Sequence, residues 1–309
     1  MEKQVLIGVT ESPYSRKALE YAAGMGSIIK QLHYTLLNVQ PQISDFLLED
    51  AITSVKAGEA LKDLKSINSD HSNSILNESR KGMIRLGIDE NRIHTVSLEQ
   101  TMGTAKQILD YGKQTRSDAI VMGKRGVSHL LESFIGSVTN TVLEHTSVTP
   151  VWAIGGNAKP SRILLAIDGS ESALRAVDHV SFMVGDNTES TISLLHVTPR
   201  LRDYCAIEFD EENNIMEDYL VKGNKQCVDS FYIHAKKIFK DAGLSESQIS
   251  INEIKSTLNI GKTIVEEAAK DNFSTIVVGT RGLNKSFFMG SVASYILANA
   301  QDSAVWLVP

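Results

Sequence analysis

The chain contains two copies of one sequence pattern, and this internal repeat constrains the fold more than any other feature. Four apolar runs of the first half have counterparts in the second half. The matched runs are residues 5–9 with 163–167, 34–39 with 192–197, 119–123 with 275–279, and 150–154 with 304–308. Residues 155–160 lie between the copies, and their glycines and proline are typical of a linker. We therefore expect two domains, residues 1–157 and 158–309.

Each copy alternates short, β-branched apolar runs with longer segments of helical periodicity. The run Ile276, Val277 and Val278 is apolar on both faces, which is typical of a strand covered by helices on two sides. This alternation predicts an α/β fold with a doubly wound parallel sheet in each half. The last strands, at 151–154 and 305–308, would otherwise leave exposed edges, so we expect the halves to pack as an intramolecular pseudo-dimer.

Charge and composition limit the possible partners. The formal net charge of −6 argues against a nucleic-acid partner, because neutralising phosphates requires a basic face. The N-terminal residues show no signal-peptide pattern, and no run approaches the ~18 to 20 apolar residues of a membrane span. We therefore expect a cytoplasmic protein that does not insert into membranes. The eight histidines show no metal-ligand spacing, so no metal site is predicted.

The most informative motif follows the predicted strand at 119–123. Gly123 and Gly126 form a Gly-x-x-Gly pair, nine residues follow, and Gly136 with Ser137 then opens a helical segment. Glycine allows backbone amides to approach a phosphate closely, and a helix N-terminus favours an anion. A Gly-x-x-Gly pair alone would indicate a turn. The full spacing between a strand and a helix indicates a phosphate-binding loop.

Polar side chains near this loop suit the same chemistry. Ser137 and Thr139 can provide hydroxyl donors, while Lys124 or Arg125 can neutralise charge at the rim. The hydroxyls would add to the backbone donors of the loop, and one of the two cations would lie at its rim.

In the stretch from Met122 to Thr139, the chain resembles the ATP-binding members of the universal stress protein family. These members carry Gly-x-x-Gly, nine residues, and then Gly-Ser or Gly-Thr, and the resemblance extends over both halves. It implies two tandem, five-stranded, Rossmann-like sheets that bind ATP, with or without Mg²⁺, at the ends of strands one, two and four. It also implies further association into a homodimer. The implied ATP contacts of the first half are Thr10, Val39, Met122, Gly123, Gly126, Gly136, Ser137, Val138 and Thr139.

The two halves depart from the family pattern in different places. Thr10 stands where ATP-binding members usually have an aspartate, which we interpret as an acceptor for ribose hydroxyls or a neighbour of the adenine. The second half keeps this residue as Asp168, but its loop has only seven residues between Gly282 and Gly290. A triphosphate needs several converging amides, so we expect the short loop to cost more than one ribose hydrogen bond, worth ~0.5 to 1.5 kcal/mol. The first half is therefore the predicted main site. A weaker site in the second half would comprise Asp168, Val197, Gly279, Gly282, Gly290 and Ser291.

Several other signals have simpler structural explanations. Ser12 and Ser170 follow the first strand of each copy and are interpreted as helix N-caps, not nucleophiles. His196 lies in an apolar run and is interpreted as a hydrogen-bonded core residue. Trp152 and Trp306 occupy matching places in the last strands and are interpreted as packing or interface residues.

The resemblance implies an ATP-binding regulator of a stress response or of signalling, in which nucleotide occupancy changes binding to a protein partner. No nucleophile, base or metal cluster accompanies the motif, so we expect no catalytic residues and, at most, weak ATP hydrolysis. Two alternatives stay open at this point. One is a nucleotide-free interaction module, and the other is an ATP-using enzyme such as a weak ATPase.

Overall fold

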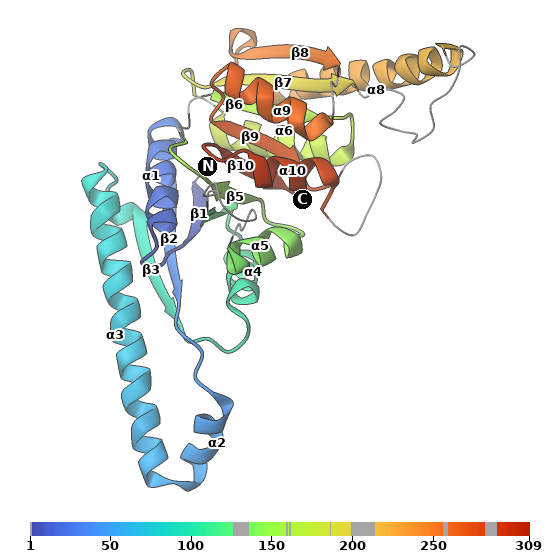
Figure 1. Ribbon diagram of the computed structural model, residues 1–309. Helices are drawn as coiled ribbons and strands as arrows, with labels where there is room; N and C mark the ends of the chain where they lie inside the picture. The colour runs from blue at the N-terminus through green and yellow to red at the C-terminus, as the bar shows by residue number, and fades with distance from the viewer. Residues whose placement is uncertain are drawn as a thin grey trace.

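The computed structural model describes residues 2–125, 136–158, 160, 162–185, 187–198, 214–255, 259–281 and 289–309, with the backbone alone for 214–227. Within these residues, strands and helices alternate along the chain and the strands form a single sheet (Figure 1). No helix in these ranges is long and apolar enough to cross a membrane.

The first half begins with a strand, whose buried Val5, Leu6 and Ile7 alternate between the two faces of the sheet. The first helix starts after Ser12, whose hydroxyl accepts a hydrogen bond from the Ser15 amide, as the N-cap interpretation predicted. The elements of this half are β1 (Lys3–Gly8), α1 (Pro13–Ile28), β2 (Leu32–Val39), α2 (Asp45–Thr53), α3 (Val55–Arg85), the 3₁₀ turn η1 (Glu90–Arg92), β3 (Ile93–Leu98), α4 (Thr104–Gln114), β4 (Ala119–Gly123), α5 (Ser137–His145) and β5 (Val151–Ile154).

The second half repeats this order. Ser170 caps its first helix by accepting from the Ala173 amide, which again confirms the N-cap interpretation. Its elements are β6 (Arg162–Ile167), α6 (Glu171–Val184), β7 (Thr191–Thr198), α8 (Asn214–Asp241), the 3₁₀ turn η3 (Glu246–Gln248), β8 (Ile249–Lys255), α9 (Ile260–Lys270), β9 (Thr275–Gly279), α10 (Ser291–Asn299) and β10 (Ala304–Val308).

The strand order is β3-β2-β1-β4-β5-β10-β9-β6-β7-β8. Neighbouring strands are parallel within each half, which confirms the predicted pair of five-stranded parallel sheets. β5 and β10 pair antiparallel, with Trp152 opposite Trp306. The two last strands thus cover each other's edges and join the halves into one continuous ten-stranded sheet, as the pseudo-dimer prediction required.

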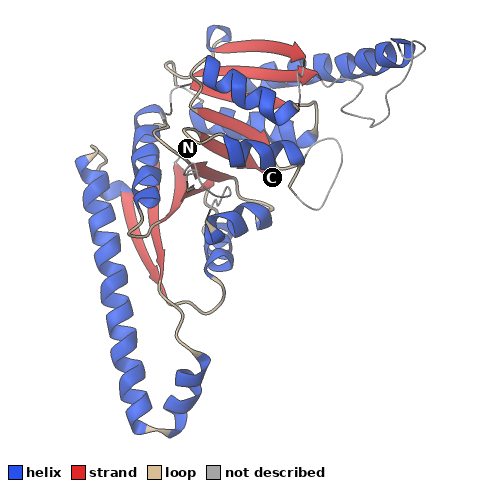
Figure 2. Ribbon diagram, viewed as in Figure 1, coloured by secondary structure: helices blue, strands red, loops and turns tan. Residues whose placement is uncertain are grey.

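Helices cover both faces of this sheet (Figure 2). Buried side chains of α1, α3, α6 and α8 form the core on one face, and those of α4, α5, α9 and α10 form the core on the other. Each core contains side chains from both halves. The protein therefore has three layers, with helices on either face of one sheet, and the two halves share both hydrophobic cores.

Two stacked tryptophans mark the centre of the boundary between the halves. The rings of Trp152 and Trp306 are fully buried and parallel, with centroids 4.0 Å apart. Each indole N–H donates to a residue of the opposite half: Trp152 to Nε2 of His179 at 3.1 Å, and Trp306 to the hydroxyl of Tyr21 at 3.0 Å. Tyr21 and His179 occupy equivalent positions of α1 and α6, and the Tyr21 hydroxyl also shares a 2.8 Å hydrogen bond with Thr275.

The imidazole of His179 is neutral in this environment. Burial lowers the pKa of His179 from 6.5 to about 3, because a charged ring would lose its hydration where it packs against the two stacked indoles. Since the Trp152 indole donates to Nε2, the neutral ring carries its proton on Nδ1, and Nε2 accepts. The hydrogen bond from Trp152 therefore depends on an uncharged histidine, whereas the one from Trp306 to Tyr21 does not.

The long segment after β2 forms an arm that projects from the sheet (Figures 1 and 2). α2 and α3 make a helical hairpin whose connection is Ser54, and the Ser54 hydroxyl accepts from the Ala57 amide to begin α3. Leu76 and Met83, near the other end of α3, are buried against the sheet. At the tip, Phe46 and Ile52 expose 77% and 84% of their surface, so the arm presents apolar side chains to solvent.

Candidate functional site

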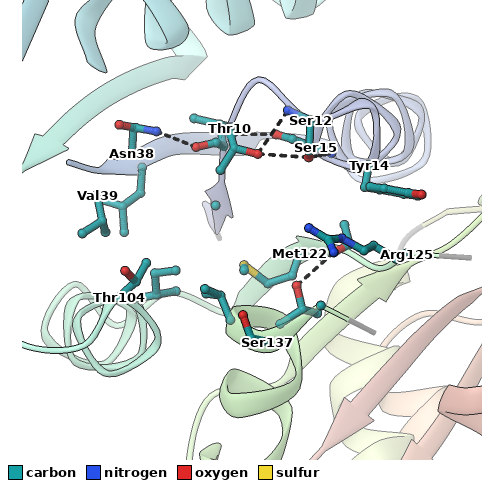
Figure 3. Close-up of a pocket in the computed structure, with 18 residues that line it drawn as sticks. Thr10, Ser12, Tyr14, Ser15, Asn38, Val39, Thr104, Met122, Arg125 and Ser137 are labelled. Carbon is teal, nitrogen blue, oxygen red and sulfur yellow. Dashed lines mark hydrogen bonds between the residues drawn. The ribbon is translucent and has the colours of Figure 1, made fainter. Parts of the chain in front are cut away.

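A cavity of about 210 Å³ lies at the carboxyl ends of β1, β2 and β4 in the first half (Figure 3). In open α/β sheets this edge is where ligands bind, because loops and helix N-termini converge there. The N-termini of α4 and α5 border the same cavity, through Thr104 and Ser137. The start of α1 contributes Tyr14 and Ser15, so six separate elements border one pocket.

The structure brings together the residues that the sequence placed in the first-half site. Gly126 lies outside the described residues. The predicted residues that line the cavity are Thr10, Val39, Met122, Gly123, Gly136, Ser137, Val138 and Thr139.

The N-terminus of α5 provides the strongest local preference for an anion. Gly136 precedes the helix with φ of +90°, a left-handed conformation that favours glycine. No side chain caps this end, and the first hydrogen bond of the helix runs from the Asn140 amide to the Gly136 carbonyl. The amides of Ser137, Val138 and Thr139 precede that bond, so they belong to the helix donors that require a partner from outside the helix. A phosphate oxygen would satisfy them and would gain from the helix dipole.

Hydroxyl groups form the opposite wall of the cavity. Figure 3 shows Thr10, Ser12 and Ser15 side by side, across the pocket from Met122 and Ser137. The Thr10 hydroxyl donates to Ser12 Oγ at 3.0 Å, and the Thr10 amide donates to Ser15 Oγ at 3.0 Å. This network orients the wall around Thr10, where the family pattern has a carboxylate.

Close packing connects β4 to the helices on either side of the pocket. A Cβ at Gly123 would lie 2.3 Å from the Tyr14 carbonyl oxygen, so this position requires glycine for steric reasons. The Thr139 hydroxyl donates to the Gly123 carbonyl at 3.0 Å and holds α5 against the strand end. Thr139 thus lines the cavity as predicted, with its hydroxyl proton donated inside the protein.

Of the two cations predicted at the rim, only Arg125 lines the cavity. Lys124 is 2% exposed and points into the second half, where its Nζ donates to the Leu297 and Ala300 carbonyls, the former at 3.2 Å. Burial lowers the pKa of Lys124 from 10.5 to about 8, and the charge of Asp302 partly opposes this shift. Of the two alternatives that the sequence offered for the rim cation, Arg125 is therefore the one in place, and Lys124 is not.

The polar lining residues that were absent from the predicted site are Ser12, Tyr14, Ser15, Asn38 and Thr104. Asn38 donates to the Val9 carbonyl at 2.8 Å and accepts from Ser72 at 2.7 Å, so it joins β1, β2 and α3 behind the pocket. The sequence feature that could have identified Asn38 is its polar side chain within an otherwise apolar strand. Ser15 and Thr104 lie near the starts of α1 and α4, where the sequence indicated only the beginning of a helix.

The corresponding residues of the second half have a different arrangement. The Gly290 amide donates to the Thr280 carbonyl at 2.9 Å, which closes the short loop against the end of β9. Asp168 accepts from the Ser170 amide at 2.9 Å and so helps to form the turn before α6. Gly282 lies outside the described residues. Of the remaining predicted residues, Val197 is the last but one of β7, Gly279 ends β9, and Ser291 begins α10.

His196 has the structural role that its position in an apolar strand predicted. Its side chain is buried, and Nδ1 lies 3.1 Å from the Ile167 carbonyl, so the ring is hydrogen-bonded in the core. In the part of the chain that the structure describes, no group of three or more His, Cys, Asp or Glu residues is arranged to hold a metal ion.

Comparisons with known proteins agree with this architecture. A universal stress protein from Archaeoglobus fulgidus is 20% identical, with a TM-score of 0.67 over 99% of this chain and 97% of that one. A functionally unknown protein and a putative universal stress protein, both from Pseudomonas aeruginosa, are 13% identical with TM-scores of 0.56 over 99% of this chain, covering 92% and 93% of theirs. These similarities show the fold. No curated protein sequence matches the chain.

A family model identifies the relationship directly. The model described as universal stress protein family matches twice, at residues 1–155 and 160–309. These two matches follow the internal repeat and cover nearly the whole polypeptide. The chain therefore belongs to the universal stress protein family, with two copies of its domain in tandem.

Proposed function

We propose that the first-half cavity binds an adenine nucleotide, ATP in particular, and that occupancy regulates binding to a protein partner. The observation that carries this proposal is the convergence of an uncapped helix N-terminus with the ends of three parallel strands on one pocket. Backbone amides at such a position favour phosphate groups without requiring a particular side chain.

The lining favours one orientation of the ligand. Arg125 and the N-terminus of α5 suit the phosphates, since the guanidinium and the helix dipole both attract negative charge. Val39 and Ile108 line the cavity together with Met122 and suit the flat, largely apolar face of a base. Figure 3 places Val39 and Thr104 on the side of the pocket away from Arg125, which separates the two regions.

We propose the first half as the main site for two reasons. Its loop is longer, and the start of α5 makes different hydrogen bonds from the start of α10. In the second half, the Gly290 amide is already bonded to the Thr280 carbonyl. Ala293 replaces Thr139 at the equivalent position, so the hydroxyl that ties α5 to its strand has no counterpart there. Asp168 supports the opposite assignment, because a carboxylate can accept hydrogen bonds from ribose hydroxyls.

A regulatory role is more consistent with the lining than turnover. Among the described residues of the cavity, Arg125 is the single charged side chain, and no histidine, cysteine or carboxylate is available as a base or nucleophile. Nucleotide binding would then act by ordering the segments around α5, and the resulting change in shape would be read by a partner.

Calorimetry on the full-length protein tests the site. ATP is expected to bind one site, and Arg125→Met is expected to weaken binding roughly tenfold or more, through loss of a charge-assisted hydrogen bond. Gly136→Val places a branched side chain beside the α5 amides at a φ of +90° and should abolish binding, and circular dichroism checks that the variant remains folded. Gly290→Val, at the equivalent position of the second half with a φ of −64°, should bind as wild type. The reverse result for the two glycine variants would assign the main site to the second half.

Two measurements address the alternative functions. Heat-denatured protein that releases no adenine nucleotide, together with no ATP binding by calorimetry, would favour a nucleotide-free interaction module. Steady-state release of phosphate from excess ATP above a protein-free control would favour an ATPase. We also propose that the chain forms a homodimer, which light scattering tests against the 33.9 kDa mass of one chain.

A further inference from the structure

Lys124 connects the first-half cavity to the second half of the protein. It directly follows β4, between Gly123 and Arg125, which both line the cavity. Its side chain leaves the pocket and is buried at the boundary between the halves. The Lys124 amide donates to the Ile154 carbonyl at 2.8 Å, so the backbone that carries this side chain is anchored to β5.

The ammonium group lies at the C-terminus of α10. Its Nζ donates to the carbonyls of Leu297, in the last turn, and Ala300, the C-cap residue. Carbonyls at a helix C-terminus lack partners within the helix, and a cation there opposes the negative end of the helix dipole. Lys124 therefore satisfies acceptors that α10 cannot satisfy by itself.

Surrounding residues leave this side chain little freedom. A Cβ at Gly155 would lie 2.5 Å from Cε of Lys124 and 2.3 Å from the Gln301 carbonyl oxygen. The lysine stem thus fills the space between the end of β5 and the segment that follows α10. A change in the backbone at Gly123 or Arg125 would move Nζ relative to its two acceptors, because the packed stem cannot absorb the displacement by changing rotamer.

The second half has no equivalent connection. Thr280 occupies the corresponding position, and its amide donates to the Val308 carbonyl at 2.8 Å, as the Lys124 amide does to Ile154. The backbones therefore match, but the threonine side chain is too short to reach the end of α5. A lysine beside the first-half cavity thus contacts α10, and Thr280 makes no reciprocal contact with α5.

We propose that Lys124 is a positioning residue that couples ligand occupancy of the first-half cavity to α10 of the second half. This inference rests on the proposed function, since it needs a ligand that restrains residues 123–125. A phosphate held by the α5 amides and Arg125 fixes the strand end, and Lys124 transmits the restraint to the α10 carbonyls. α10 begins at Gly290 and Ser291, so the site predicted for the second half responds to the first.

Hydrogen exchange on the full-length protein tests the coupling, with calorimetry to measure ATP binding. Saturating MgATP is expected to slow amide exchange in α10 at least roughly fivefold, which is the lower range of coupling between sites. α9 lies on the same face without this lysine contact and should change less. In Lys124→Met the effect of ATP on α10 should disappear, whereas the matched variant Lys236→Met, at an exposed position of α8, should keep it.

The outcomes separate the two proposals. Absence of ATP binding to the wild-type protein refutes the proposed function and the coupling together. ATP binding without a change in α10, or with an equal change in α9, refutes the coupling alone and does not require a folded variant. An effect of ATP that persists in folded Lys124→Met also refutes it. A loss confined to Lys124→Met supports it, because a merely structural lysine would alter stability without altering the response to ATP.

Discussion

Replacing His179 with glutamine is expected to make the protein more resistant to acid. His179 accepts a hydrogen bond from the Trp152 indole at the boundary between the halves, and it can do so only while its ring is neutral. A glutamine side chain has a carbonyl oxygen that can accept from the same indole but cannot take up a proton in this range. The variant therefore separates the effect of the hydrogen bond from the effect of the charge.

The pKa of His179 determines the size of this effect. It is lowered by burial from 6.5 to about 3 in the folded protein. Below pH 6.5 the unfolded chain binds a proton that the folded chain does not, so the free energy of unfolding decreases until the pH reaches about 3. One pKa unit corresponds to about 1.4 kcal/mol, so lowering the pH from 7 to 4 should remove roughly 3 kcal/mol. This loss is large beside a typical stability of about 5 to 15 kcal/mol.

Urea unfolding followed by tryptophan fluorescence measures the effect at each pH. At pH 7 the glutamine variant should be somewhat less stable than the wild type, because its side chain packs less well. Between pH 7 and pH 4 the free energy of unfolding of the wild type should fall by roughly 3 kcal/mol more than that of the variant. His145→Gln, at an exposed position of α5, is the control and should follow the wild type. If wild type and His179→Gln lose stability in parallel between these pH values, the assignment of a buried, neutral imidazole is wrong.

Three further variants test other parts of the structure. Between pH 8 and 10.5 the stability of the wild type relative to Lys124→Met should rise by up to roughly 3 kcal/mol in urea unfolding, because burial lowers the pKa of Lys124 to about 8 in the folded protein and the variant lacks this group. Trp306→Phe removes the indole donor to Tyr21 and should destabilise the protein by about 1 to 3 kcal/mol, while an unchanged unfolding midpoint would contradict the interface assignment. Gly123→Ala places a methyl group against a carbonyl oxygen of α1 and should reduce ATP affinity, whereas Gly279→Ala, equally crowded in the second half, should not.

The architecture was predictable because it depends on local patterns that occur twice. Apolar runs such as 276–278 are strands buried on both faces, and the serines at 12 and 170 begin helices as their side-chain chemistry requires. The joining of the halves followed from the unpaired edges of the last strands. The prediction did not reveal that the two hydrophobic cores would each extend over both halves, since that depends on the twist and register of the joined sheet.

The sequence predicted the cavity residues whose position depends on the backbone. It did not predict which of two neighbouring side chains points into the cavity. Gly123, Gly136 and Ser137 reach the cavity because strand ends and helix starts must lie at that edge. Lys124 and Arg125 are neighbours in sequence with the same charge, yet only Arg125 faces the pocket. Lys124 is drawn away by carbonyls 173 and 176 residues later in the chain, a contact that no local pattern encodes.

Covalent fusion of the two halves frees their shared boundary from symmetry. In a dimer of separate identical chains, one substitution would appear on both sides of the two-fold axis at once. Here Tyr21 and His179 hold equivalent places but carry different chemistry, so only one side responds to acid. Tethering also keeps the halves paired at any protein concentration, because the local concentration of one for the other is set by the linker. Each copy can therefore accumulate substitutions separately, and one can specialise while the other preserves the pairing.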